Sequence, residues 1–230
     1  MKRSTFILLL CVGIAAHADD LRVRLFSASP PTEIEIIPQT ATLRACAGCK
    51  AQRVDGPLKF VATAHLVHYG KIKTPVLFIE GKYRLRASGA LTGDLEAPLQ
   101  IRAADGRLLI IARLPQERYV ALALGGEAGG IKSAEALKAI AVTIRTYAAR
   151  FRARHGAPEF NLCDSTHCQV LRLSDTNPAW RAAAEATAGE LLWYDGALAY
   201  AYHHASCGGT LEDGRVMLGR AVPYLQQQPD

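Results

Sequence analysis

The 230-residue sequence contains no apolar run long enough to cross a bilayer, no long repeats and no low-complexity segment. It also lacks a dense stripe of basic residues interleaved with aromatic residues, which disfavours nucleic acid as a partner. Half of the residues are apolar and 21% are charged, a composition typical of globular proteins and unlike disorder. The sequence therefore predicts a folded chain with a real core, as one domain or a domain plus a smaller module.

The first 18 residues have the three parts of a secretory signal peptide. A basic "MKR" precedes the apolar "STFILLLCVGIA", and Ala16-His17-Ala18 forms an A-x-A cleavage site. Cys11 lacks the small residue expected before a lipidated cysteine, so we do not expect a lipoprotein. We expect cleavage and export to the cell envelope (periplasm or cell wall) or secretion, without a later transmembrane segment; a retained N-terminal anchor is the alternative.

Cleavage would change both the charge and the cysteine count. Removing Lys2 and Arg3 from the 27 basic residues leaves 25 against 21 acidic ones, a net charge of +4. This mild excess suits an anionic wall polymer or a membrane surface. Five cysteines would remain, and an odd number cannot all pair within one chain, so one thiol stays free or some cysteines hold a metal. They are Cys46, Cys49, Cys163, Cys168 and Cys207.

The spacing of apolar residues changes along the chain and predicts an α+β fold. Residues 19–114 alternate between polar and apolar, as in a sheet that is wet on one side, with residues 44–57 read as a loop. The spacing of "CAGC" (Cys46 to Cys49) without a surrounding βαβ pattern favours a local disulfide. We assign residues 115–230 to a second part that carries the chemistry, with a truncated C-terminus as one interpretation.

Helical periodicity begins at Ser133, a suitable N-cap, and runs to a stop at Gly156. A second helix is predicted from Asn177, with Pro178 in its first position, to Gly189. The following "ELLWYDGALAYAYHH" predicts a hairpin with Asp195-Gly196 as its turn.

One carboxylate, Glu127, stands between two glycine pairs in "GGEAGG", after an apolar stretch read as a strand. Low polarity would raise the pKa of this carboxyl and suit a general acid, whereas a nearby helix N-terminus would favour the ionised form. The absence of side chains would let an extended ligand approach the backbone. The alternative is a surface acid in a glycine turn.

"CDSTHC" places Cys163, His167 and Cys168 within six residues. Thiolates and imidazole are good zinc ligands, and a tetrahedral site would need one more. A disulfide is the alternative, either Cys163–Cys168 or one of them with Cys207. The possible fourth ligands are Cys207, His203, His204 and His155.

"YHHASCGG" (Tyr202 to Gly209) follows the hairpin and brings polar, reactive groups to a sheet edge. A nucleophilic pair of Cys207 with His204 or His167 is conceivable. Surface histidines with ordinary partners are the alternative, and a metal- or thiol-dependent enzyme centred on the cysteines is a further hypothesis.

Three segments together resemble the SpoIID/LytB domain family over about residues 115–225. They are "RLPQERYVALALGGEAGGIKSAEALKAIAVTIRTYAARF", "NLCDSTHCQV" and "AAAEATAGELLWYDGALAYAYHHASCGG". The family comprises secreted bacterial cell-wall proteins, named for a stage II sporulation protein and an amidase enhancer. The resemblance implies a lytic transglycosylase that cleaves peptidoglycan glycan strands stripped of their peptides by an amidase.

The resemblance also implies roles for individual residues. Glu127 matches the family's catalytic glutamate. Arg145 and Tyr147 match a helix that lines or braces the cleft, and we expect both to bind substrate. His204 and Ser206 fall in the family's His-x-Ser-x-Gly-Gly segment and are likewise expected to bind substrate. A structural zinc ion at Cys163, His167 and Cys168 is similar to that of some members.

The chain departs from the family pattern after Glu127, where Ala128, Gly129 and Gly130 replace the usual Met-Pro step. "VMLGR" replaces a Trp-Gly-Gly stretch, and relatives commonly continue beyond "VPYLQQQPD". These departures favour an alternative function, a non-catalytic glycan-binding enhancer of an N-acetylmuramoyl-L-alanine amidase.

Overall fold

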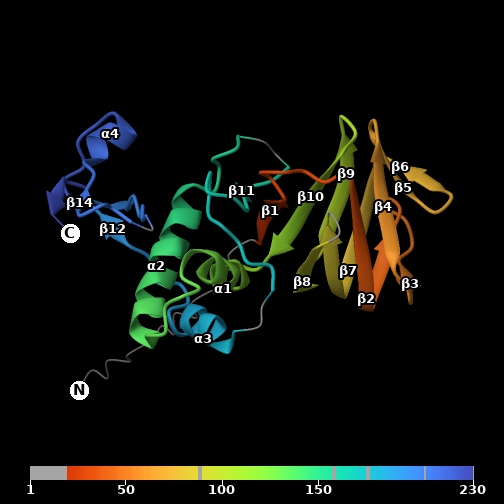
Figure 1. The fold of residues 1–230 in the computed structure, drawn as a ribbon, viewed down its shortest axis with the longest axis horizontal. Helices are drawn as coiled ribbons and strands as arrows, with labels where there is room; N and C mark the ends of the chain where they lie inside the picture. Colours follow the sequence, from red (N-terminus) through yellow and green to blue (C-terminus); the bar gives the residue numbers. More distant parts are fainter. Residues whose placement is uncertain (1–19, 88–89, 157–158, 175–176, 205, 230) are drawn as a thin grey trace, which may run out of the picture.

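The computed structural model of the chain describes residues 20–87, 90–156, 159–174, 177–204 and 206–229. The predicted signal peptide, residues 1–18, lies outside the described residues. A large sheet built mainly from the first half of the chain is followed by helices and short hairpins (Figure 1), which confirms the predicted α+β class.

Alternating burial forms the large sheet, as the sequence pattern predicts. In β1 the residues Leu21, Val23 and Leu25 are buried, and the arginines between them are half-buried on the other face. The strands before the first helix are β1 (Leu21–Leu25), β2 (Glu33–Arg44), β3 (Gln52–Val54), β4 (Leu58–Thr63), β5 (Leu66–Tyr69), β6 (Ile72–Thr74), β7 (Val76–Ala87), β8 (Ala90–Glu96), β9 (Leu99–Ala104) and β10 (Arg107–Leu114).

The sheet order is β11-β1-β10-β9-β7-β2-β4-β5-β6, with β3 on β2 and β8 on β7. It curves so that β4 and β5 also contact β9, and the apolar faces of its strands form one continuous core with the helices. Strand β3 lies inside the segment 44–57 that the sequence predicts to be a loop, which corrects that prediction. The adjacent disulfide Cys46–Cys49 confirms the predicted local pairing.

The strand β1 joins the two halves of the chain. It pairs antiparallel with β10 and parallel with β11 (Leu162–Cys163). The carboxylate of Asp164, just after β11, accepts hydrogen bonds from the Phe26 N–H at 2.6 Å and the Ser27 N–H at 2.9 Å. The loop that carries the cysteine pair is therefore anchored to the N-terminal strand.

Three helices lie together at the β1 and β10 end of the sheet (Figure 1): α1 (Gln116–Glu127), α2 (Ala134–Arg150) and α3 (Pro178–Ala186). Helix α1 replaces the strand that the sequence predicts before Glu127. All residues from Tyr119 to Gly125 are buried, so the segment has no polar face, and an apolar run without a polar face gives no helical period.

Side-chain caps begin α2 and α3 where the sequence predicts them. Ser133 accepts from the Ala136 N–H, and Asn177 accepts from the Ala179 N–H, with Pro178 in the first turn of α3. Helix α2 ends at Arg150 rather than extending to Gly156, and residues 151–155 form turns.

The C-terminal part lies on the side of α2 away from the sheet (Figure 1). Strands β12 (Trp193–Tyr194) and β13 (Ala197–Leu198) form the predicted hairpin, and both turn residues, Asp195 and Gly196, have positive φ. The remaining elements are β14 (Thr210–Leu211), α4 (Gly214–Leu218) and β15 (Gln228–Pro229). Among the described residues, no helix has the length and apolar character needed to cross a membrane.

Candidate functional site: a carboxylate–histidine pair beside a cysteine–histidine cluster

Glu127 is the last residue of α1, and two groups contact its carboxylate. Oε1 accepts a hydrogen bond from the Val170 N–H at 2.6 Å, and Oε2 lies 3.1 Å from Nε2 of His203. The side chain of Glu127 is 19% exposed and that of His203 is 34% exposed. The carboxylate is therefore held on one side by the backbone and on the other by a titratable, accessible imidazole.

The pKa of Glu127 lies below its ordinary value. Burial raises the pKa, but the hydrogen bonds from His203 and the Val170 N–H, together with the charge of His203, lower it by more. The carboxylate also lies at the C-terminal end of α1 instead of near a helix N-terminus. Hydrogen bonding, and not a helix dipole, therefore favours the ionised form in the free protein.

The glycines before Glu127 serve packing rather than ligand access, which corrects the expectation from the sequence. A Cβ at Gly126 would lie 2.1 Å from the carbonyl oxygen of Val170, and one at Gly125 would lie 2.7 Å from the ring of Trp180. The missing side chains let α1 approach the segment that supplies the Val170 N–H. A Cβ at Gly130, by contrast, would meet open space.

Two adjoining hollows lie beside Glu127. The first, of about 370 Å³, is lined by Glu127 itself and the second, of about 250 Å³, is more apolar. They share Tyr202, His203, His204 and Met217, so they form one open trough. The carboxylates among the residues that line the trough are Glu127 in the first hollow and Glu212 in the second.

Arg145 does not line this trough, which corrects its predicted contact with substrate. Its side chain is fully buried, and its guanidinium donates to both oxygens of Glu117, with Nε at 3.0 and 3.2 Å. It also donates to the carbonyl oxygens of Ala184 and Glu190 at 2.9 and 3.3 Å. Arg145 thus links α1 and α2 to α3 and the segment after it.

Of the other three residues expected to bind substrate, two line the trough and one does not. Tyr147 lines the first hollow, and burial raises the pKa of its phenol to about 12. His204 lines both hollows. Ser206 is exposed and is not among the described residues that line either one.

Sequence reasoning missed His203 as the partner of Glu127. It named this residue only as one of several possible metal ligands. The only signal was the pair of adjacent histidines in "YHHASCGG", and nothing local tells which of the two faces a residue 76 positions earlier.

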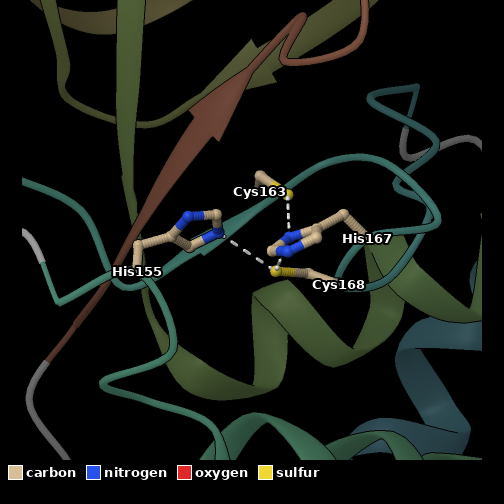
Figure 2. A group of neighbouring side chains, drawn as sticks. All are labelled: His155, Cys163, His167 and Cys168. Atoms are coloured by element: carbon tan, nitrogen blue, oxygen red, sulfur yellow. Dashed lines mark hydrogen bonds between the residues drawn. The ribbon is translucent and has the colours of Figure 1, made fainter.

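Four side chains converge next to the first hollow (Figure 2): His155, Cys163, His167 and Cys168. Their nitrogen and sulfur ligand atoms all lie within 4.8 Å of one another. The Nδ1 of His167 is 3.6 Å from each sulfur, and the Nε2 of His155 is 3.3 Å from the Cys168 sulfur. The two cysteines are thiols rather than a disulfide.

These distances fit a tetrahedral ion. Zinc bonds of about 2.3 Å to sulfur and 2.0–2.1 Å to nitrogen place neighbouring ligand atoms about 3.6 Å apart. Of the candidate fourth ligands from the sequence, His155 is the one that the structure brings to the other three. His203 and His204 line the trough instead, and the Cys207 sulfur accepts from the Gly209 N–H at 3.2 Å.

Burial dominates the electrostatics of the cluster. Burial raises the pKa of the Cys168 thiol to about 12. Burial, followed by the nearby His167 and Arg154, lowers the pKa of His155, which keeps it in the neutral form that binds metals.

The fold and site define an α+β domain with the carboxylate of Glu127 in an open trough, next to a Cys₂His₂ cluster. Residues 104–194 match the family model described as SpoIID, stage II sporulation protein. This match supports the resemblance to the SpoIID family that the sequence motifs predict. The matched residues include Glu127 and all four side chains of the cluster, whereas His203 and His204 lie after the match.

No curated protein and no solved structure matches the chain. The match to the SpoIID family model indicates a cell-wall-related role.

Proposed function

We propose that the protein is a peptidoglycan lytic transglycosylase that acts on peptide-stripped glycan strands, with Glu127 as general acid and then general base. The observation that carries this proposal is the carboxylate of Glu127 at the wall of an open trough, within hydrogen-bond reach of His203. Ordinary glycoside hydrolysis uses two carboxyl groups. A lytic transglycosylase needs only one, because the sugar supplies its own nucleophile.

The proposed reaction balances without water. Protonated Glu127 donates its proton to the oxygen between N-acetylmuramic acid and N-acetylglucosamine, and the bond from muramic C1 to that oxygen breaks. The N-acetylglucosamine leaves with a hydroxyl. The resulting carboxylate accepts the proton of the muramic C6 hydroxyl as O6 bonds to C1, which closes a 1,6-anhydro ring and restores the acid.

Because the pKa of Glu127 is lowered, its carboxylate needs a proton donor before it can act as an acid, and we propose that His203 is this donor. A protonated imidazole 3.1 Å from Oε2 can pass its proton to the carboxylate. A sugar that covers the trough displaces water, and this desolvation favours the neutral acid. In this proposal the working group is the Glu127–His203 pair, which holds one proton when substrate binds.

We further propose that His155, Cys163, His167 and Cys168 hold a structural zinc ion. All four protein ligands are present, which is typical of closed structural sites. Zinc would neutralise the thiolates and cross-link the 155–168 loop. This cross-link matters to the trough because Thr166, His167 and Cys168 line the hollow next to Glu127.

A second candidate function is a non-catalytic glycan-binding enhancer of a cell-wall amidase. The lowered pKa of Glu127 favours it, because a carboxyl that is ionised at neutral pH is a poor proton donor. In either role we propose export through the N-terminal signal, with peptidoglycan glycan strands as the binding partner.

Digestion of purified, peptide-free glycan strands tests the proposal. The wild-type protein should release products ending in 1,6-anhydromuramic acid, detected by mass spectrometry, and Glu127→Gln should bind the strands but release none. Wild-type release by Glu127→Gln would contradict the catalytic role. No product from either protein, together with faster turnover of an added N-acetylmuramoyl-L-alanine amidase, would support the enhancer.

A further inference from the structure

An aromatic surface lies on the C-terminal part of the molecule, next to the trough. We call the residues Phe151, Trp193, Tyr194, Tyr200 and Tyr224 the aromatic platform. Among the described residues, the aromatic side chains that are exposed all belong to it: Trp193 at 61%, Tyr194 at 47% and Tyr224 at 39%. Exposed apolar side chains that gather in one place mark an interaction surface.

The β12–β13 hairpin presents Trp193 to solvent. Its positive-φ turn fixes the register, which places Trp193 opposite Leu198. The ring of Tyr194 lies 4.8 Å from that of Tyr224, which attaches the hairpin to the C-terminal segment. Trp193, Leu198 and Tyr200, with residues 149–151 at the end of α2, line an open hollow of about 580 Å³.

Two arginines add positive charge to the platform. The guanidinium of Arg150 lies 3.5 Å from the centre of the Tyr200 ring, and that of Arg220 lies 5.2 Å from it. Arg150 donates to the Leu198 carbonyl oxygen and Arg220 donates to the Tyr200 hydroxyl. Flat ring faces and guanidinium donors therefore share one surface.

The platform is continuous with the Glu127 trough through ring contacts. Phe151 lies 4.6 Å from Tyr147 and 5.7 Å from Tyr202, both of which line the first hollow. Tyr200 stacks with Tyr202 at 6.1 Å. A polymer that occupies the hollow beside Glu127 can thus cross Tyr202 onto the platform without leaving the surface.

We propose that the aromatic platform is a second binding site for the glycan strand, which holds sugars several units away from the bond beside Glu127. This inference rests on the proposed function for the identity of the polymer. The C–H faces of pyranose rings pack on flat aromatic rings, as other apolar groups do. The lactyl carboxylate of muramic acid is the group that Arg150 and Arg220 fit, because guanidinium pairs strongly with carboxylates.

The composition of the platform favours a glycan over a protein partner. Its hollow is open, its rings contact Tyr147 and Tyr202 of the trough, and its charge is complementary to a polymer that repeats a carboxylate. A distal site would also supply binding energy remote from the reacting bond, so long strands would bind more tightly than short ones.

Tryptophan fluorescence tests the inference directly, because the sequence has two tryptophans and Trp180 is buried in α3. In a Glu127→Gln background, titration with peptide-free strands of four or more disaccharides should quench and shift the Trp193 emission, and a single disaccharide should not. Trp193→Ala should weaken binding of long strands about tenfold or more, measured by calorimetry. Trp193→Phe should retain most of the affinity.

Matched variants isolate the contribution of the platform. Ile72→Ala removes an apolar side chain on β6 that is 39% exposed and lies outside the platform, and should leave binding unchanged. Arg220→Ala should weaken binding of muramic-acid strands more than binding of chitooligosaccharides, which carry no carboxylate. Unchanged melting temperatures would confirm that each variant is folded.

The outcomes separate this inference from the proposed function. Equal affinity of Trp193→Ala and its parent for long strands would overturn the platform, even if the wild type produces anhydro sugars. So would a Trp193→Ala variant that loses only amidase binding, since the surface would then serve a protein. A Trp193 signal on long strands, without any anhydro product from the wild type, would uphold the platform and reject the transglycosylase.

Discussion

The Oε2 atom of Glu127 lies 3.1 Å from Nε2 of His203, and these two residues are 76 positions apart in the chain. The pair joins the end of α1 to the segment after the β12–β13 hairpin. This contact links the segment that matches the SpoIID family model to the C-terminal part that follows it.

The pair predicts a pH dependence of stability. Because the pKa of Glu127 is lowered in the fold, its ionised form contributes stability above the unfolded pKa of about 4.3, and that contribution is lost as pH falls through the folded pKa. Glu127→Gln should therefore lower the free energy of unfolding by about 1 kcal/mol at pH 7. The difference should shrink toward zero below about pH 4, measured by urea unfolding across pH. A difference that grows in acid would contradict the assignment.

His203→Ala should raise the pKa of Glu127, since it removes a hydrogen bond and a charge that lower this pKa. Carbon-13 NMR of labelled glutamate carboxyls would measure it, with Glu127→Gln to assign the signal. His204→Ala is the matched control. His204 lines the trough, but among the described residues the histidine that is hydrogen-bonded to Glu127 is His203. An equal shift from both variants would argue against the pair.

Gly126→Ala should destabilise the protein by about 1–3 kcal/mol, because its Cβ meets the Val170 carbonyl oxygen and overpacking forces the backbone to move. Gly130→Ala is the control. Its Cβ meets open space, so the free energy of unfolding should stay within about 0.5 kcal/mol or rise slightly. If the two substitutions changed the free energy of unfolding equally, the packing role of Gly126 would be wrong.

Arg145→Met should cost about 3 kcal/mol, since it leaves Glu117 without its buried partner. Arg145→Lys should recover only part of this loss, because an ammonium cannot reproduce the guanidinium fork. The exposed pair Arg53–Asp55 provides a control, and Arg53→Ala should change stability by less than about 1 kcal/mol. If Arg145→Met weakened glycan binding without loss of stability, the bracing role would be wrong.

Purified protein should contain one zinc ion per chain by atomic emission, and a strong chelator should lower the melting temperature by several degrees because the ion cross-links the loop. Cys168→Ser and His155→Ala should lose the metal. Cys207→Ser should retain it, since that thiol lies outside the cluster. Retention of full zinc content by Cys168→Ser would refute the assigned ligands.

The elements that the sequence predicted well are those with local signals. Alternation in β1, the caps Ser133 and Asn177, and the Asp195-Gly196 turn each depend on a few neighbouring residues. The helix α1 was mistaken for a strand because its middle is buried on every side. Burial on all faces removes the polar–apolar contrast that reveals a helical period.

The site was predictable in its residue types and not in its pairings. Glu127 and the cysteine block stand out in the sequence and in the family resemblance. The burial of Arg145 depends on Glu117, 28 residues earlier, and the role of His203 depends on a contact across 76 residues. Such distant contacts are set by tertiary packing, which one sequence without its structure does not specify.

The junction between β1 and β11 bears on when this protein becomes functional as it folds. The Arg22 N–H donates to the Asn161 side chain across 139 residues, and contacts at such separation form slowly because closing a long loop costs conformational entropy before the contact is made. Binding of the proposed zinc ion to the adjacent cysteines would then be among the last events of maturation. Substitutions in the first strand would delay it while leaving every ligand in place.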